Sequence, residues 1–236
     1  MKKKLVVFSG AGISAESGLR TFRDSDGLWE EYNVMDVATP EAWQKDMALV
    51  LEFYNKRRVQ ILEANPNPAH HAVKLLEEKY DVTVITQNID DLHERAGSSH
   101  VVHLHGNIRF ARSTNPSDAD RLYPIKGNHL NPGDKCPEGF QLRPHVVWFG
   151  EEVPLLPVAQ KIVERADYLI ISGTSLTVYP AANLIYAANY KCKKYLVDPG
   201  SIHVTDIENL SFIKEKASLG LPKLAEMLLK EEVING

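Results

Sequence analysis

The chain has 236 residues, 44% of them hydrophobic and 25% charged, and these proportions exclude a disordered or fibrous protein. Its formal net charge of -4 leaves no surplus of Lys and Arg for the basic face that nucleic-acid binding requires, so no nucleic-acid partner is expected. With only Cys136 and Cys192 there can be no disulfide framework, and we expect a cytoplasmic protein. The first apolar run, Leu5 to Phe8, is too short for a signal peptide or a membrane span, so no membrane partner is expected.

A glycine-containing turn follows this run, which itself predicts a strand. Gly10, Gly12 and Ala15 match the G-x-G-x-x-G/A pattern, in which backbone N–H groups and the start of a helix meet a pyrophosphate. The segment therefore predicts a dinucleotide site, although a strand-to-helix turn without a ligand would fit the pattern alone.

The residues after the turn argue against simple hydride transfer. A dehydrogenase would place an acidic residue at the end of a second strand about 20 residues later. Residues 19–29 do not have the pattern of a strand. They favour a loop over the nucleotide, with Arg23 near a phosphate and Phe22 near the reacting sugar.

Short apolar runs alternate with helical patterns along the remaining chain. Strands are expected at Leu5–Phe8, Val82–Thr86, Val101–Leu104, Tyr168–Ser172 and Tyr195–Val197. Helices are expected at Pro40–Asn65, Ala69–Tyr80, Asp91–Ala96, Val158–Ala166, Pro180–Ala188 and Leu221–Glu232. This alternation predicts an α/β fold, a Rossmann-like parallel sheet with helices on both faces.

Two segments interrupt the alternation and predict a small lobe formed by two insertions. Residues 29–69 are helical without sheet partners, and residues 107–142 are rich in Asn, Pro, Gly, Asp and Ser. Residues 1–28, 70–106 and 143–236 then form the Rossmann-like domain. Ligand sites often lie between lobes, so we expect the cleft there.

Two polar clusters follow predicted strands, and the carboxyl ends of parallel strands meet at one edge of a sheet. Thr86 to Asp90 offers two amides and a carboxylate, which suit the ribose and carboxamide of a nicotinamide, although a capped strand end is the simpler explanation. His103 and His105 have the spacing that turns both side chains to one side of a strand.

Six segments in order resemble the sirtuin family of NAD-dependent protein lysine deacylases. They are Gly10–Ser14, Phe22–Arg23, Thr86–Asp90, His103–Gly106, Val146–Glu151 and Gly173–Leu176, and the resemblance extends from about residue 5 to about residue 225. It implies that acyl-lysine and NAD enter the cleft from opposite sides, that the acyl oxygen attacks C1′ of the nicotinamide ribose, and that nicotinamide leaves. By motif position, His105 is the catalytic base, and Asn88 and Asp90 orient the ribose and nicotinamide.

The resemblance also assigns the remaining site residues. Cofactor-binding positions are Gly10, Ala11, Gly12, Ile13, Ala15, Phe22, Arg23, Gln87, Asn88, Ile89, Asp90, Gly173, Thr174, Ser175, Asp198 and Ala217. Asp198 stands where many relatives have Asn, and its carboxylate would favour NAD over NADP. Substrate-binding positions are Val146, Val147, Phe149, Gly150 and Glu151, in a segment expected to pair with the acyl-lysine peptide by strand addition. A core strand is the alternative for this segment.

Tyr54 and Arg57 are i and i+3 on a predicted helix and so share a face. They resemble the pair with which desuccinylase and demalonylase sirtuins hold the acyl carboxylate, although such pairs also occur on ordinary exposed helix faces. A guanidinium fits a carboxylate with two hydrogen bonds, and a phenol adds a neutral donor.

Most sirtuins bind zinc in the small lobe with two CxxC pairs, and here the sequence departs from the family. Cys136 is alone in that region, with His129 nearby, and Arg112-Ser113 stands where the first pair would begin. Structural zinc needs four such ligands, so no metal site is expected and the lobe is interpreted as a zinc-less remnant of the zinc-binding module.

The sequence therefore predicts an NAD-dependent deacylase that removes acetyl, and also succinyl or malonyl, groups from acylated lysine side chains of proteins. Nicotinamide and O-acyl-ADP-ribose would be released. The alternatives are ADP-ribosyl transfer to a protein and a non-catalytic NAD or ADP-ribose sensor.

Overall fold

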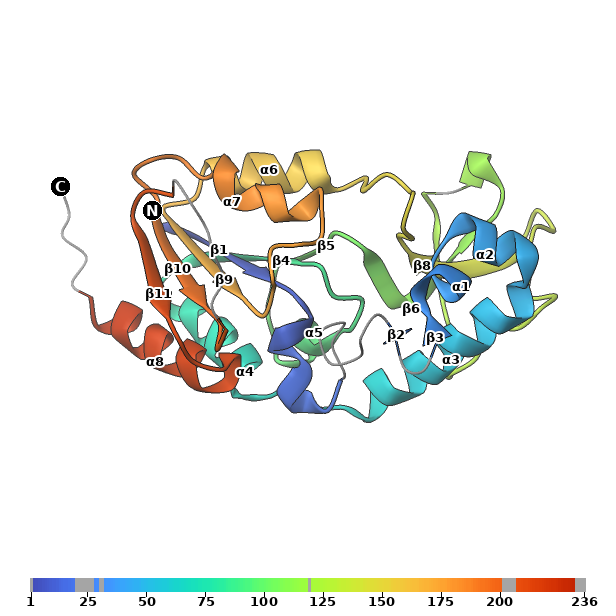
Figure 1. Cartoon of the computed structure of the whole chain (residues 1–236), viewed down its shortest axis with the longest axis horizontal. Coiled ribbons are helices and arrows are strands. Elements are labelled where there is room, and N and C mark those ends of the chain that lie inside the picture. The colour runs from blue at the N-terminus through green and yellow to red at the C-terminus, as the bar shows by residue number, and fades with distance from the viewer. Residues whose placement is uncertain (1, 20–27, 30–31, 119, 201–206, 232–236) are drawn as a thin grey trace.

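The structure is a computed structural model that describes residues 2–19, 28–29, 32–118, 120–200 and 207–231. Its larger lobe is built on a six-stranded sheet in the order β11-β10-β9-β1-β4-β5, in which every pair is parallel (Figure 1). The strands are β1 (Lys4–Ser9), β4 (Asp81–Thr86), β5 (Val101–His103), β9 (Tyr168–Ser172), β10 (Lys193–Val197) and β11 (Leu210–Ile213). All five strands expected from the sequence are confirmed, and β11 was not expected.

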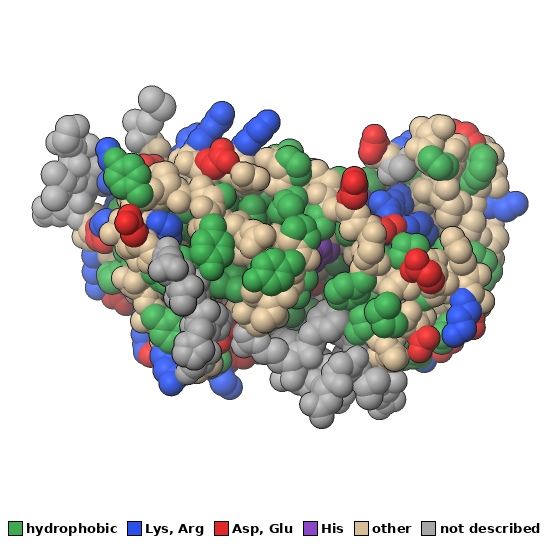
Figure 2. Space-filling view, turned by 45° about the horizontal axis from the view of Figure 1, so that its top comes forward, with side chains coloured by type: hydrophobic (Ala, Val, Ile, Leu, Met, Phe, Trp, Pro, Cys, Tyr) green, Lys and Arg blue, Asp and Glu red, His purple; other side chains and the backbone are tan. Residues whose placement is uncertain are grey.

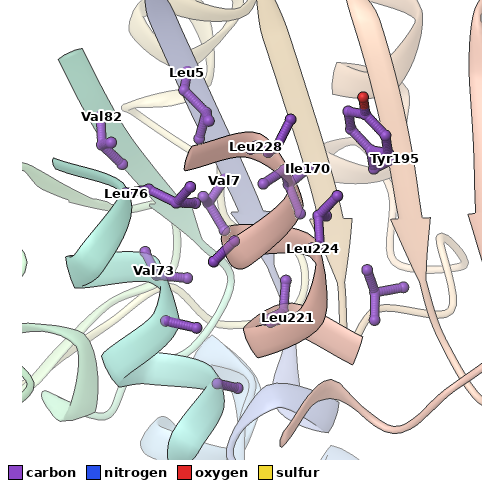
Figure 3. Close-up of a cluster of buried hydrophobic side chains, with 14 of the residues drawn as sticks. Leu5, Val7, Val73, Leu76, Val82, Ile170, Tyr195, Leu221, Leu224 and Leu228 are labelled. Carbon is purple, nitrogen blue, oxygen red and sulfur yellow. The ribbon is translucent and has the colours of Figure 1, made fainter. Parts of the chain in front are cut away.

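Helices cover both faces of this sheet, which confirms the α/β, Rossmann-like class. On one face α4 (Pro68–Leu75) and α8 (Ala217–Lys230) pack on Leu5 and Val7 of β1 (Figure 3). On the other, α6 (Leu156–Glu164) and α7 (Leu184–Ala187) pack on Val6 and Phe8. Because successive side chains of β1 enter different cores, the strand needs an unbroken apolar run.

Several expected helices have different bounds in the structure. The long helix expected at Pro40–Asn65 is two helices, α2 (Pro40–Lys45) and α3 (Met47–Glu63). The break occurs at Asp46, whose carboxylate accepts the Leu49 amide and caps α3. The other short helices are α1 (Val34–Val37), η4 (Leu76–Glu78), α5 (Leu92–Arg95), η5 (Pro116–Asp118) and η6 (Ala181–Asn183).

The smaller lobe contains a three-stranded antiparallel sheet, β7-β6-β8, instead of the irregular segment expected at 107–142. Its strands are β6 (Gly106–Ser113), β7 (Leu122–Pro124) and β8 (Leu142–Val146), and α3 packs on it (Figure 1). A two-stranded antiparallel sheet of β2 (Leu28–Trp29) and β3 (Tyr32–Asn33) precedes α1. Strand β8 includes residues 143–146, which sequence analysis placed in the larger domain. Within the described ranges, no helix is both long and apolar enough to cross a bilayer.

Candidate active site

A cavity of about 350 Å³ lies between the carboxyl edge of the parallel sheet and the small lobe. Figure 2 shows this hollow, with hydrophobic side chains at its rim and a histidine in its depth. The cavity brings together eighteen residues named from the sequence: Gly10, Ala11, Gly12, Tyr54, Arg57, Gln87, Asn88, Ile89, Asp90, His105, Val146, Val147, Phe149, Gly150, Glu151, Gly173, Thr174 and Ser175. Segments separated by more than 160 residues therefore share one site.

The glycine turn after β1 packs directly against the turn after β9. The Gly12 amide donates to the Gly173 carbonyl at 2.8 Å, and a Cβ on Gly12 would lie 2.7 Å from the Gly173 Cα. Gly12 is therefore required by contact with a neighbouring turn, a reason that sequence analysis did not consider. The G-x-G-x-x-G/A pattern places the start of a helix after this turn. Two three-residue 3-10 turns, η1 (Ala11–Ile13) and η2 (Ala15–Ser17), occur there instead.

A buried network holds Asn88 and Asp90 at the base of the cavity. Asn88 Nδ2 donates to the Gly10 carbonyl and to Ser14 Oγ, each at 3.2 Å. Ser14 Oγ donates to Asp90 Oδ2 at 3.0 Å, and the Leu92 amide donates to Asp90 Oδ1 at 3.1 Å. Burial raises the pKa of Asp90, while these donors act in the opposite direction. Ser14 lines the cavity and was not named as a site residue, although it belongs to the GAGIS motif.

His105 has the hydrogen bond that a general base needs. Its Nδ1 lies 2.9 Å from the Gln87 carbonyl oxygen, and because a carbonyl can only accept, Nδ1 carries the proton. Nε2 is then unprotonated. Burial lowers the pKa of His105, so the neutral imidazole is the form present near pH 7.

His103 has a different role from His105. Its Nδ1 lies 3.0 Å from the Asn88 carbonyl oxygen, and its Nε2 lies 2.6 Å from Glu94 Oε1 and 3.2 Å from Asn107 Nδ2. Burial opposes the charged form, but the hydrogen bond and charge of Glu94 outweigh it and raise the pKa of His103. His103 therefore supports the backbone of Asn88 through the contact of its Nδ1 with the Asn88 carbonyl.

Tyr54 and Arg57 of α3 face the cavity and are not surface residues. Both are buried, and both line the same cavity as His105. The Trp148 indole Nε1 donates to the Tyr54 hydroxyl at 3.1 Å, and Arg57 Nη1 donates to Gln60 Oε1 at 3.4 Å. Burial raises the pKa of Tyr54, which keeps the phenol neutral and able to donate a hydrogen bond.

The segment Val146–Glu151 runs from the end of β8 along the mouth of the cavity. The Val147 amide donates to the His105 carbonyl at 2.9 Å, and the Phe149 amide donates to the Ala38 carbonyl at 3.0 Å. Trp148 is buried, whereas Phe149 is 46% exposed. The amides of Val147 and Phe149 are therefore already used within the protein, and strand addition by a peptide would have to use other backbone groups of this segment.

Some residues named from the sequence lie outside the cavity that the described residues form. Ile13 is buried in the core between β1, α4 and α8. Ala15, Asp198 and Ala217 are not part of the cavity wall, and Asp198 Oδ1 accepts the Gly200 amide at 2.8 Å. Phe22 and Arg23 lie outside the described residues. The wall also contains residues that sequence analysis did not assign to the site: Ser14, Leu19, Ala38, Ile61, Trp148, Val153, Val178, Tyr179 and Pro180.

The cavity has the groups that a nicotinamide dinucleotide requires. Gln87 Oε1 accepts from Thr174 Oγ1 at 2.9 Å, while the buried Gln87 Nε2 has no partner among the described residues. A buried donor without an acceptor is unfavourable, and a ribose hydroxyl would supply the acceptor. Asn88 and Asp90 stand beside it, so the residues fit NAD.

Potential metal ligands in the described part of the chain form one group of three. The ligand atoms of Asp118, Cys136 and Glu138 lie within 4.8 Å of one another. Asp118 also accepts the Tyr123 hydroxyl at 2.5 Å, and Ser113 Oγ donates to Cys136 Sγ at 3.3 Å. Structural zinc uses four ligands, and this group supplies three.

Comparison of sequences connects this site with known enzymes. A model of the Sir2 family matches residues 10–180. An NAD-dependent protein deacylase of Bacteroides thetaiotaomicron is 47% identical over 230 residues, which are 96% of this chain and 98% of that protein. An NAD-dependent protein deacylase of Helicobacter pylori strain 26695 is 50% identical over 229 residues, 95% of this chain and 99% of that protein.

Comparison of structures agrees with the sequence matches. The crystal structure of a Sir2 homolog–NAD complex superposes with a TM-score of 0.86 at 40% identity, covering 97% of this chain and 90% of that chain. The structure of Sir2Tm bound to a propionylated peptide superposes with a TM-score of 0.77 at 28% identity, covering 98% of this chain and 95% of that chain.

Proposed function

This chain belongs to the Sir2 family of NAD-dependent protein deacylases, and we propose that it removes succinyl and malonyl as well as acetyl groups from lysine side chains of proteins. The products would be nicotinamide, the free lysine and O-acyl-ADP-ribose. A solved relative with bound NAD and another with a propionylated peptide support a cleft that takes both a dinucleotide and an acyl-lysine.

The observation that carries the acyl preference is that Tyr54 and Arg57 line the same cavity as His105. Arg57 is only 7% exposed, and its planar guanidinium has the geometry for two parallel hydrogen bonds to a carboxylate. An acyl chain that ends in a carboxylate can form these bonds, whereas an acetyl group cannot. A hydrogen bond to a charged group contributes about 1.5–3 kcal/mol, so we expect a preference of about tenfold or more for succinyl over acetyl.

The roles of the chain's own residues follow from their hydrogen bonds. Asn88 and Asp90, fixed by Ser14, would orient the nicotinamide ribose, and Gln87 Nε2 would donate to a ribose hydroxyl. When bound, NAD supplies the glycosidic bond whose cleavage releases nicotinamide and provides the acceptor for the acyl group. His105 Nε2, unprotonated and facing the cavity, would take the proton of the ribose hydroxyl that attacks the acyl carbon.

The two alternatives differ in one observable property. A deacylase releases nicotinamide only when an acyl-lysine peptide is present, whereas a protein ADP-ribosyltransferase releases it with an unacylated acceptor. An NAD sensor releases none. The neutral His105 with an unprotonated Nε2 favours catalysis, because a binding module has no need of a base there.

The proposal is tested by nicotinamide release with three peptides of one sequence that carry acetyl-, succinyl- or malonyl-lysine. Arg57→Met should lower kcat/KM for the succinyl and malonyl peptides about tenfold and change it little for the acetyl peptide. The matched control is Lys56→Met, which removes an exposed charge from the same helix. Equal losses on all three peptides with Arg57→Met would contradict the acyl assignment.

A further inference from the structure

We propose that Arg143, which does not line the active-site cavity, sets acyl-chain selectivity by positioning Trp148 against the hydroxyl of Tyr54. The inference rests on the proposed function, in which Tyr54 and Arg57 receive the acyl carboxylate. It assigns to Arg143 a positioning role, because its side chain contacts Trp148 and Glu151 of the cavity wall without lining the cavity itself.

Arg143 holds the face of the Trp148 ring. The centre of its guanidinium lies 3.2 Å from the ring centroid, which is a close stacking contact. The same guanidinium donates from Nη1 to Glu151 Oε1 at 2.6 Å and from Nη2 to Glu151 Oε2 at 3.1 Å. Nη2 also donates to the Val146 carbonyl at 2.9 Å. These contacts hold the planar guanidinium of Arg143 in one orientation, and the Arg143 side chain is only 10% exposed.

Glu151 holds the backbone of the same tryptophan. Its Oε2 accepts the Trp148 amide at 2.8 Å, and both of its oxygens accept from Arg112 Nη2, at 3.0 and 3.1 Å. The Trp43 ring lies beside the indole, with centroids 5.7 Å apart. Trp148 is therefore fixed at its ring by Arg143 and at its amide by Glu151, and its one side-chain donor is directed at Tyr54.

These contacts act on the Tyr54 hydroxyl, which would bind the acyl carboxylate, more than on the groups that would take part in the reaction. Because the Tyr54 oxygen accepts from the indole, the direction of the Tyr54 O–H depends on where Trp148 stands. Two guanidinium groups share one carboxylate in the cluster of Arg112, Arg143 and Glu151, so the cluster carries a net positive charge next to the cavity. An acetyl group lacks the carboxylate that would respond to either feature.

The first experiment compares kcat and KM for succinyl and acetyl peptides in Arg143→Met, Arg143→Lys and the wild-type enzyme. Arg143→Met should raise KM for the succinyl peptide about tenfold with a smaller change in kcat, and should change the acetyl KM less than about threefold. Arg143→Lys keeps the charge but cannot bind Glu151 with two parallel bonds, so an intermediate KM is expected. The matched control is Arg121→Met, because Arg121 stacks on Tyr123 in the same lobe, outside this cluster.

A double-mutant cycle tests whether Arg143 acts through the indole. Trp148→Phe keeps an aromatic ring but removes the N–H that reaches Tyr54, so it should lower the succinyl-to-acetyl ratio of kcat/KM about as much as Arg143→Met does. The double variant should be no worse than Trp148→Phe alone. Losses that multiply in the double variant would overturn the proposal. If Arg143→Met does not fold, Arg143→Lys takes its place in the cycle.

The outcomes separate this inference from the proposed function. If the wild-type enzyme removes succinyl groups, Arg57→Met impairs this activity and Arg143→Met lowers both activities equally, the function stands and Arg143 is only structural. If the wild-type enzyme has no desuccinylase activity, the acyl assignment of Tyr54 and Arg57 fails, and with it the role given to Arg143.

Discussion

The Nδ1 atom of His105 lies 2.9 Å from the carbonyl oxygen of Gln87, and this contact decides which nitrogen of the neutral imidazole is able to accept a proton. The main-chain carbonyl cannot change its role with pH, so the proton remains on Nδ1 and the Nε2 lone pair faces the cavity. His103, two residues earlier, meets the carboxylate of Glu94, which raises its pKa although burial opposes the charged form. The pKa values of two histidines in one short segment are thus shifted in opposite directions.

The first prediction concerns the pH dependence of deacylation. Burial lowers the pKa of His105 from 6.5, and the base must be deprotonated, so kcat/KM should fall only when the pH drops below about 6.5. His105→Ala should lower kcat by about 100-fold or more while acyl-peptide binding remains. A pH profile of kcat/KM checks this. An acidic limb centred above pH 7 would contradict the assignment.

The second prediction concerns the pH dependence of stability from the pair of His103 and Glu94. Because the pKa of His103 is raised in the folded protein, its protonation stabilises the fold. This stabilisation is complete below pH 6.5 and is lost as the pH rises through the folded-state pKa. Because the pKa of Glu94 is lowered in the folded protein, its ionised form stabilises the fold. This stabilisation is complete above pH 4.5 and is lost as the pH falls through the folded-state pKa. Glu94→Gln should therefore lower Tm most between about pH 4.5 and 6.5. A difference in Tm that is constant up to pH 9 would exclude this linkage.

The third prediction concerns Gly12, where a Cβ would lie 2.7 Å from the Gly173 Cα and 2.9 Å from the Gly173 carbonyl oxygen. Neither turn can move aside without breaking the bond from the Gly12 amide to that carbonyl. Gly12→Ala should lower the free energy of unfolding by about 3 kcal/mol, the cost of overpacking a close contact. Urea denaturation measures this, and NAD binding should weaken as well.

Gly133→Ala is the control for this measurement. Gly133 has a φ of +93° with open space around the position of its Cβ, so only backbone strain of about 1–2 kcal/mol is expected and NAD binding should not change. If the two alanine variants were equally stable and bound NAD equally well, close packing of the two turns would not be what requires Gly12.

The central strands of the parallel sheet were predictable because they are buried on both faces. Runs such as Leu5–Phe8 have no other simple explanation than a strand between two cores. The small-lobe sheet, and β11 at the edge of the parallel sheet, were not predictable in this way. In β6, Arg109 and Arg112 interrupt the apolar pattern, and β11 has four residues of which Ser211 and Phe212 are exposed. These strands are specified by their partners and not by local pattern.

In the candidate site too, some features follow from local sequence pattern and others depend on contacts between distant segments. Tyr54 and Arg57 could be paired from helical spacing, and the turns at the strand ends could be placed on one edge of the sheet. The Trp148 indole donating to Tyr54 joins residues 94 positions apart, and no local pattern contains that information. The same holds for the contact between Gly12 and Gly173, which depends on β1 and β9 being neighbours.

The measurement that tests the account most directly is NAD-dependent nicotinamide release by the wild-type enzyme and by Tyr54→Phe, with succinyl- and acetyl-lysine peptides of one sequence. Tyr54→Phe removes the hydroxyl, so kcat/KM for the succinyl peptide should fall about tenfold while that for the acetyl peptide stays within about threefold. Wild-type release that does not depend on an acyl-lysine peptide, or an equal loss on both peptides in Tyr54→Phe, would contradict the account.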